Sequence, residues 1–205
     1  MAFSYYKSIG QVQREFGVKF QEENFISAQD VEPPESFLKE YEFNRKNIDV
    51  YTSEASRADL VITPILREVY KCYHKQYSFW IQKSIVYNDR LNGTPDYIIA
   101  TRSALGKTVL EFPLVLVVEA KKNDFEQGWG QCLAELIAAQ KLNNTAEQVV
   151  YGIVTDGELW KFGKLKEDTF TSNIDGYTVG DLARLFGALN FIFQAVSRNG
   201  DRSPA

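Results

Sequence analysis

The sequence feature that most constrains the fold is the apolar run LVLVVEA over Leu114–Ala120. An almost continuous run of aliphatic residues is typical of a strand that is buried on both faces of a sheet. A second run of this kind covers residues 149–155. Such strands need helices on both sides of the sheet. The sequence therefore predicts an α/β fold with a central mixed β-sheet flanked by helices.

Helical and strand patterns surround these two runs. Ser53 is a plausible N-cap, and the residues after it place apolar side chains on one helical face as far as Tyr73. Two further helices are expected over 126–142 and 178–199, the last with Thr178 as its cap. The remaining strands are expected over 79–87, 96–101 and 159–165, with turn signals at Asn92-Gly93 and Asp156-Gly157.

A chain of 205 residues fits a single domain over 1–205. Its first part, 1–52, is polar and acidic and is interrupted by Pro33-Pro34, so we expect an N-terminal extension there. The core is expected over 53–166, and the C-terminal helix over 178–199. Phe191 and Ile192 lie off the apolar stripe of that helix. They are expected to pack either on residues 1–52 or on another subunit, the latter as a homo-oligomer.

The histidine count excludes several kinds of metal site. The chain has one histidine, His74, so no site in a single copy can use two imidazoles. Any metal must then be held mainly by carboxylates, which favour Mg²⁺, Mn²⁺ or Ca²⁺. The two cysteines are sixty residues apart and fit a reducing cytoplasm. No apolar run approaches 18 residues, so we expect no membrane segment and a cytoplasmic location.

The charge is unevenly distributed. The net charge of −4 argues against strong non-specific binding to nucleic acid. Residues 67–122, however, carry nine Lys or Arg against five Asp or Glu, a net charge of +4. A mildly basic middle segment therefore lies within an acidic chain.

Two short motifs in this segment carry the charges most relevant to chemistry. Asp96 opens a strand directly after a turn, and Glu119 and Lys121 end the apolar run. Alternate residues of a strand face the same side, so Glu119 and Lys121 share a face. If the two strands are neighbours, Asp96 comes close to Glu119. Two carboxylates and a lysine would then lie together at one end of the sheet.

This group suits the hydrolysis of a phosphodiester. Asp96, Glu119 and the main-chain carbonyl of Ala120 can hold Mg²⁺ or Mn²⁺, which polarises a phosphoryl group and lowers the pKa of water. Lys121 can orient the attacking water or neutralise developing charge. The alternatives are a turn-stabilising role for Asp96 and an exposed salt bridge for Glu119 and Lys121, which is worth about 0–1 kcal/mol.

Pro95-Asp96 followed by Glu119-Ala120-Lys121 resembles the PD-(D/E)XK nucleases. The surrounding sequence is similar to the N-terminal nuclease domain of type I restriction enzyme R subunits over roughly 53–166. The segments that carry this similarity are Ser53-Glu54-Ala55, Ile62-Thr63-Pro64-Ile65-Leu66, Gly128 with Gln131, and Tyr151-Gly152-Ile153-Val154-Thr155-Asp156-Gly157-Glu158-Leu159-Trp160.

The resemblance implies a restriction-endonuclease-like core, Mg²⁺-dependent endonuclease activity on DNA and specific residue roles. Asp96 and Glu119 would be the metal ligands, and Lys121 the catalytic lysine. Glu54, or Glu68 in its place, would support the metal site from the first helix, and Gln131 would lie near the metal water or the nucleic acid. Glu135, on the same helical face as Gln131, stands where a related exonuclease pattern has tyrosine.

Three functions remain open from the sequence. The first is a metal-dependent nuclease, which the resemblance associates with a protein partner supplying a motor or specificity. The second is a catalytically silent nucleic-acid-binding or accessory module of a restriction or mobile-element system. The third is an oligomerisation or interaction protein that uses its C-terminal helix. The sequence does not decide between DNA and RNA.

Overall fold

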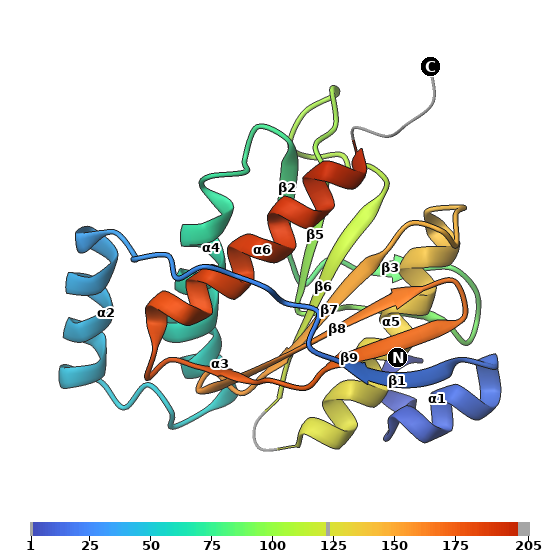
Figure 1. The fold of residues 1–205 in the computed structure, drawn as a ribbon, viewed down its shortest axis with the longest axis horizontal. Coiled ribbons are helices and arrows are strands. Elements are labelled where there is room, and N and C mark those ends of the chain that lie inside the picture. The colour runs from blue at the N-terminus through green and yellow to red at the C-terminus, as the bar shows by residue number, and fades with distance from the viewer. Residues whose placement is uncertain (1, 122–123, 201–205) are drawn as a thin grey trace.

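The computed structural model describes residues 2–121 and 124–200, and their ribbon is shown in Figure 1. The helices, in chain order, are η1 (Phe3–Tyr5), α1 (Ile9–Phe16), α2 (Glu35–Asn47), α3 (Glu54–Arg57), the π-helix η2 (Ala58–Ile62), α4 (Thr63–Tyr70), α5 (Phe125–Leu142) and α6 (Leu182–Gly200). The strands are β1 (Lys19–Glu23), β2 (Tyr77–Ile81), β3 (Ile85–Val86), β4 (Asn92–Gly93), β5 (Tyr97–Thr101), β6 (Leu114–Ala120), β7 (Val150–Thr155), β8 (Leu159–Lys166), β9 (Thr169–Asn173) and β10 (Tyr177–Thr178).

One mixed sheet organises the molecule. Within the described residues it has eight strands in the order β1-β9-β8-β7-β6-β5-β2, with β10 paired to β8. The β6–β7 and β1–β9 pairs are parallel, and the other pairs are antiparallel. The apolar run that ends at Ala120 forms β6, with β5 and β7 on its two sides.

Helices cover both faces of this sheet. One apolar cluster joins the sheet to α2, α4 and α6, and a second joins its other face to α1 and α5. In Figure 1, α6 crosses the sheet diagonally in front and α5 lies behind. The fold class is therefore as expected: α/β, with the large mixed sheet and flanking helices of a restriction-endonuclease-like core.

Several local signals act as expected. The side chain of Ser53 accepts a hydrogen bond from the N–H of Ser56 and caps α3. Asp156-Gly157 connects the antiparallel strands β7 and β8, and Gly157 has a φ of 89°, which favours glycine. The expected helix over 53–73 is divided by η2, which ends just before Pro64; the ring of Pro64 cannot donate a main-chain hydrogen bond.

Two expected boundaries are wrong. The strand predicted over 79–87 is two strands, because β2 ends at Ile81 and Gln82 has a φ of 49°. β3 then pairs with β4, which contains Asn92-Gly93, in a separate small sheet. The C-terminal helix begins at Leu182 and not at Thr178. Thr178 belongs to β10, and the side chain of Asp181 accepts the hydrogen bond from the N–H of Arg184 that caps the helix.

The residues expected to form an N-terminal extension pack closely on the core. β1 extends the main sheet by pairing with β9, in the register Lys19↔Thr169. A Cβ on Gly130 of α5 would lie 2.6 Å from the main-chain nitrogen of Ser8, so the start of α1 approaches α5 as closely as glycine permits. The domain boundaries at 52 and 166 stay predictions.

The C-terminal helix buries a wider face than its apolar stripe predicts. Ile192 is buried in the cluster with Phe193, and Phe191 packs partly against the same cluster. Ile192 therefore packs within this chain, in a cluster to which α2, part of residues 1–52, also contributes. Among the described residues, no helix is both long enough and apolar enough to cross a membrane.

Candidate active site

Strand register brings Asp96 to the end of β6. β5 and β6 are antiparallel, and Tyr97 pairs with Val118, so the residue before Tyr97 lies beside the residues after Val118. The main-chain N–H of Ala120 donates a hydrogen bond of 2.8 Å to Oδ2 of Asp96. The two motifs, 23 residues apart in sequence, therefore meet as the alternation of the strands predicts.

Glu119 and Lys121 face each other at the same end of the sheet. Lys121 Nζ lies 3.0 Å from Glu119 Oε1, and 4% of the Glu119 side chain is exposed against 24% of the Lys121 side chain. The alternative of an exposed salt bridge does not describe this pair, because its carboxylate is buried. A buried pair is costly to desolvate unless further interactions compensate.

The two carboxyl groups have raised pKa values. The pKa of Glu119 is raised to about 7, because burial and then the charge of Asp96 raise it more than Lys121 lowers it. Burial also raises the pKa of Asp96, while the Ala120 N–H and then Lys121 lower it. Clustered, desolvated carboxylates of this kind are typical of functional sites, although structural networks produce them too.

Lys121 is held in its charged form. Burial lowers its pKa, but Glu119 and then Asp96 and Glu54 raise it, and the net shift is upward. Glu54 is the exposed first residue of α3, and its charge reaches Asp96, Glu119 and Lys121. The structure therefore brings Glu54 to the rim of this cluster, next to its cap residue Ser53.

Helix α5 follows the cluster and packs on it. Asp124 caps α5 by accepting a hydrogen bond from the N–H of Gln127. A Cβ on Gly128 would lie 2.6 Å from Val154 Cγ1 and 3.3 Å from Lys121 Cγ, so this glycine lets α5 approach the sheet. Gln131, one turn later, is buried, and its Oε1 accepts a hydrogen bond of 3.4 Å from Gln127 Nε2. Its role toward water or nucleic acid stays a prediction.

Glu135 is a member of the cluster for which the sequence analysis predicts no role. It is 1% exposed, and its pKa is raised well above the ordinary value by burial and then by the charges of Glu119 and Asp96. The sequence feature that points to Glu135 is its position four residues after Gln131, which places the two side chains on the same helical face. Periodicity does not show that a carboxylate at this position points inward.

The donor set suits a hard divalent cation. Asp96, Glu119 and the Ala120 carbonyl offer oxygens only, as Mg²⁺ and Mn²⁺ prefer. Within residues 2–121 and 124–200, no group of three or more Asp, Glu, His or Cys side chains is arranged to hold a metal ion. Two carboxylates still fit Mg²⁺, which is usually bound by one or two carboxylates and keeps several waters.

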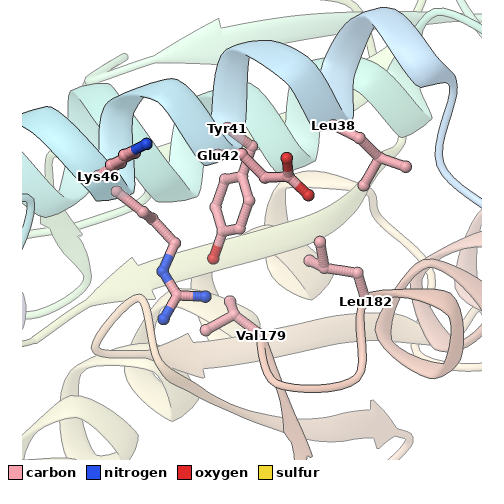
Figure 2. Close-up of a pocket in the computed structure, with 7 residues that line it drawn as sticks. Leu38, Tyr41, Glu42, Lys46, Val179 and Leu182 are labelled. Atoms are coloured by element: carbon pink, nitrogen blue, oxygen red, sulfur yellow. The ribbon is translucent and has the colours of Figure 1, made fainter.

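An open hollow lies elsewhere on the molecule. It has a volume of about 450 Å³ and lies between α2 and the start of α6. Figure 2 shows Tyr41 extending from α2 toward Val179. The guanidinium of Arg45 lies 5.7 Å from the centre of the Tyr41 ring. None of the predicted site residues lines this hollow, so the charged cluster and the hollow are different places.

Comparison with known proteins adds little to this geometry. No known protein family matches the chain, and no curated protein matches it. The chain is similar to one in a cryo-EM structure of a DrdV–DNA complex, with a TM-score of 0.44 and 13% identity over 78% of this chain. It spans only 14% of the length of that chain. At this level of similarity, function has to be argued from the site.

Proposed function

We propose that this protein is a metal-dependent nuclease that hydrolyses phosphodiester bonds in DNA. The observation that carries the proposal is the meeting of Asp96, Glu119 and Lys121 at one end of β5 and β6. In this reading, Asp96, Glu119 and the Ala120 carbonyl hold Mg²⁺ or Mn²⁺. The preference for DNA comes from the resemblance to the restriction nucleases described above.

The residues of the site have different roles in the proposed reaction. Bound at this site, the cation supplies Lewis-acid polarisation of the phosphoryl group and lowers the pKa of water. The ammonium of Lys121, beside Glu119, orients the attacking water or neutralises the charge that develops on phosphate. In this proposal, Gln131 and Glu54 support the site. The cation also offsets part of the repulsion between this acidic chain and a polyanion.

Nicking of supercoiled plasmid in Mg²⁺ or Mn²⁺ tests the proposal. We expect nicking by the wild type and none by Glu119→Gln, which keeps the shape of the side chain but removes its charge. Glu111→Gln is the matched control, because Glu111 precedes the opposite end of β6 and accepts hydrogen bonds from Ser103 and from the N–H of Phe112. Equal nicking by the Glu119 and Glu111 variants would refute the assignment. Single-stranded DNA and RNA substrates, run in parallel, determine the polymer.

A catalytically silent nucleic-acid-binding or accessory module is the second candidate. The observation that favours it is the lack, in the described part of the chain, of a three-side-chain metal group. Titration calorimetry with Mn²⁺ separates the two candidates. Binding that is lost in Asp96→Ala supports the nuclease, whereas no binding by the wild type supports the accessory module.

A further inference from the structure

The carboxyl of Glu135 is buried with one oxygen unpartnered, and it shares a hydrogen bond with Glu119. Glu135 is 1% exposed, and its Oε2 atom has no hydrogen-bond partner among the described residues. An unsatisfied buried carboxyl oxygen lowers stability, and most buried polar atoms in proteins are paired. A group of this kind in a native fold therefore calls for a ligand or a functional role.

The packing of α5 places this carboxyl behind Glu119. A Cβ on Gly152 would meet Cys132 Sγ at 2.9 Å and Leu136 Cδ1 at 3.0 Å, so the α5 residues around Glu135 lie directly on β7. Gly152 pairs with Val117, two residues before Glu119 on β6. Glu119 is the strongest charged neighbour of Glu135, and Asp96 is the next.

Acidic side chains outnumber basic side chains at this place. The carboxyl groups of Asp96, Glu119 and Glu135 face one ammonium group, that of Lys121. A divalent cation and its hydration shell would supply both positive charge and hydrogen-bond donors to such a group. Mg²⁺ held by one or two carboxylates keeps several waters, and such waters can donate to a nearby carboxylate oxygen.

We propose that Glu135 belongs to the divalent-cation site as a positioning residue that lies behind Glu119 and increases the affinity for the cation. It acts through Glu119 and through the hydration of the cation, and is not itself a ligand. This agrees with the lack of a three-side-chain metal group among the described residues. The inference rests on the cation site of the proposed function and does not require that the protein cleave DNA.

Titration calorimetry with Mn²⁺ alone tests the inference on the full chain. The variants are Glu135→Gln, which keeps the shape of the side chain, and Glu135→Leu, which replaces the carboxyl by an apolar group. The control is Glu147→Gln, which removes one negative charge from an exposed position after α5. We expect both Glu135 variants to bind Mn²⁺ about 10-fold or more weakly, as for other residues that support metal ligands. The control is expected to bind like the wild type.

Thermal unfolding without cation distinguishes a cation role from a purely structural one. Glu135→Leu removes an unpartnered buried oxygen, so we expect its unfolding temperature to equal or exceed that of the wild type. Unchanged Mn²⁺ affinity together with a lower unfolding temperature would assign Glu135 to the core alone and overturn the inference.

A third variant covers the case in which the first two do not fold. Glu135→Asp keeps the carboxyl and draws it back by one methylene, so we again expect weaker Mn²⁺ binding; unchanged affinity overturns the inference. Comparing nicking with Mn²⁺ binding distinguishes failure of the nuclease proposal from failure of this inference. A wild type that binds Mn²⁺ without nicking DNA, and binds it more weakly after Glu135→Gln, defeats the proposed function and supports the inference. The opposite result is a wild type that nicks DNA and Glu135 variants that bind Mn²⁺ as tightly as the wild type. That result supports the proposed function and overturns the inference.

Discussion

The main-chain N–H of Ala120 and the carboxylate of Asp96 are joined by a hydrogen bond of 2.8 Å, which ties the start of β5 to the end of β6. The position of Asp96 is therefore set by strand register, here Tyr97 opposite Val118, as well as by its own side-chain rotamer. Sites built on paired strands hold their geometry better than sites built on loops. The two carboxylates are thus placed before any cation arrives.

Asp96→Ala and Asp96→Asn separate the structural part of Asp96 from its charge. The alanine variant leaves the Ala120 N–H without its acceptor, and we expect a loss of about 1–3 kcal/mol in the free energy of unfolding. The asparagine variant keeps an oxygen acceptor and should lose less. Both should bind Mn²⁺ weakly, because the carboxylate is gone. Urea unfolding and calorimetry measure the two effects. Equal destabilisation by both variants would contradict the role of the hydrogen bond.

The raised pKa of Glu119 predicts a stability that falls with pH. Its pKa is about 7 in the folded protein, against an ordinary value of 4.5. Between these values the folded state binds more protons than the unfolded state, so stability decreases as the pH rises through this window. We expect cation-free wild type to lose thermal stability from about pH 4.5 to pH 7, and Glu119→Gln to lose less.

Mg²⁺ provides the control for this pH dependence. A bound cation favours the ionised carboxylate, so the decline should be smaller in Mg²⁺ than in chelator. Thermal unfolding across the same pH range measures both curves. Slopes that are identical in the wild type and Glu119→Gln without cation would show that Glu119 does not titrate in this window.

The sequence predicts the centre of this fold better than its edges. β6 and β7 follow from their apolar runs, and the meeting of Asp96 with Glu119 follows from strand alternation. β1 has no such signal, because all five of its residues are exposed at the edge of the sheet. The inward direction of Glu135 depends on how α5 packs against β7, which is a tertiary contact and not a local pattern.

Gly128 is expected to be essential for the close packing of α5. A Cβ at this position would lie 2.6 Å from Val154 Cγ1. We expect Gly128→Ala to destabilise the protein by about 1–3 kcal/mol through overpacking, despite the better helix propensity of alanine. Gly10→Ala is the control, since a Cβ on Gly10 of α1 has nothing within 4 Å, and it should stabilise by about 0.5–1 kcal/mol. Urea unfolding distinguishes the opposite signs.

Lys121 and Glu119 should be energetically coupled. Lys121→Met leaves the buried carboxylate of Glu119 without its ammonium partner, so we expect a clear loss of stability at pH 8 in chelator. Adding Glu119→Gln removes that uncompensated charge and should recover part of the loss. A double-mutant cycle measured by urea unfolding is then expected to give a coupling of about 0.5–3 kcal/mol.

The same two variants separate the lysine from the cation site. If Lys121 acts on water or on the phosphoryl charge, Lys121→Met abolishes nicking while Mn²⁺ binding persists, because the carboxylates that hold the cation are intact. Loss of Mn²⁺ binding in this variant would instead assign Lys121 to holding Glu119 in place. Additive stabilities in the cycle would show that the 3.0 Å contact between Lys121 and Glu119 contributes no net coupling. The assignment of Lys121 as the catalytic lysine therefore requires that Lys121→Met lose nicking and retain Mn²⁺ binding.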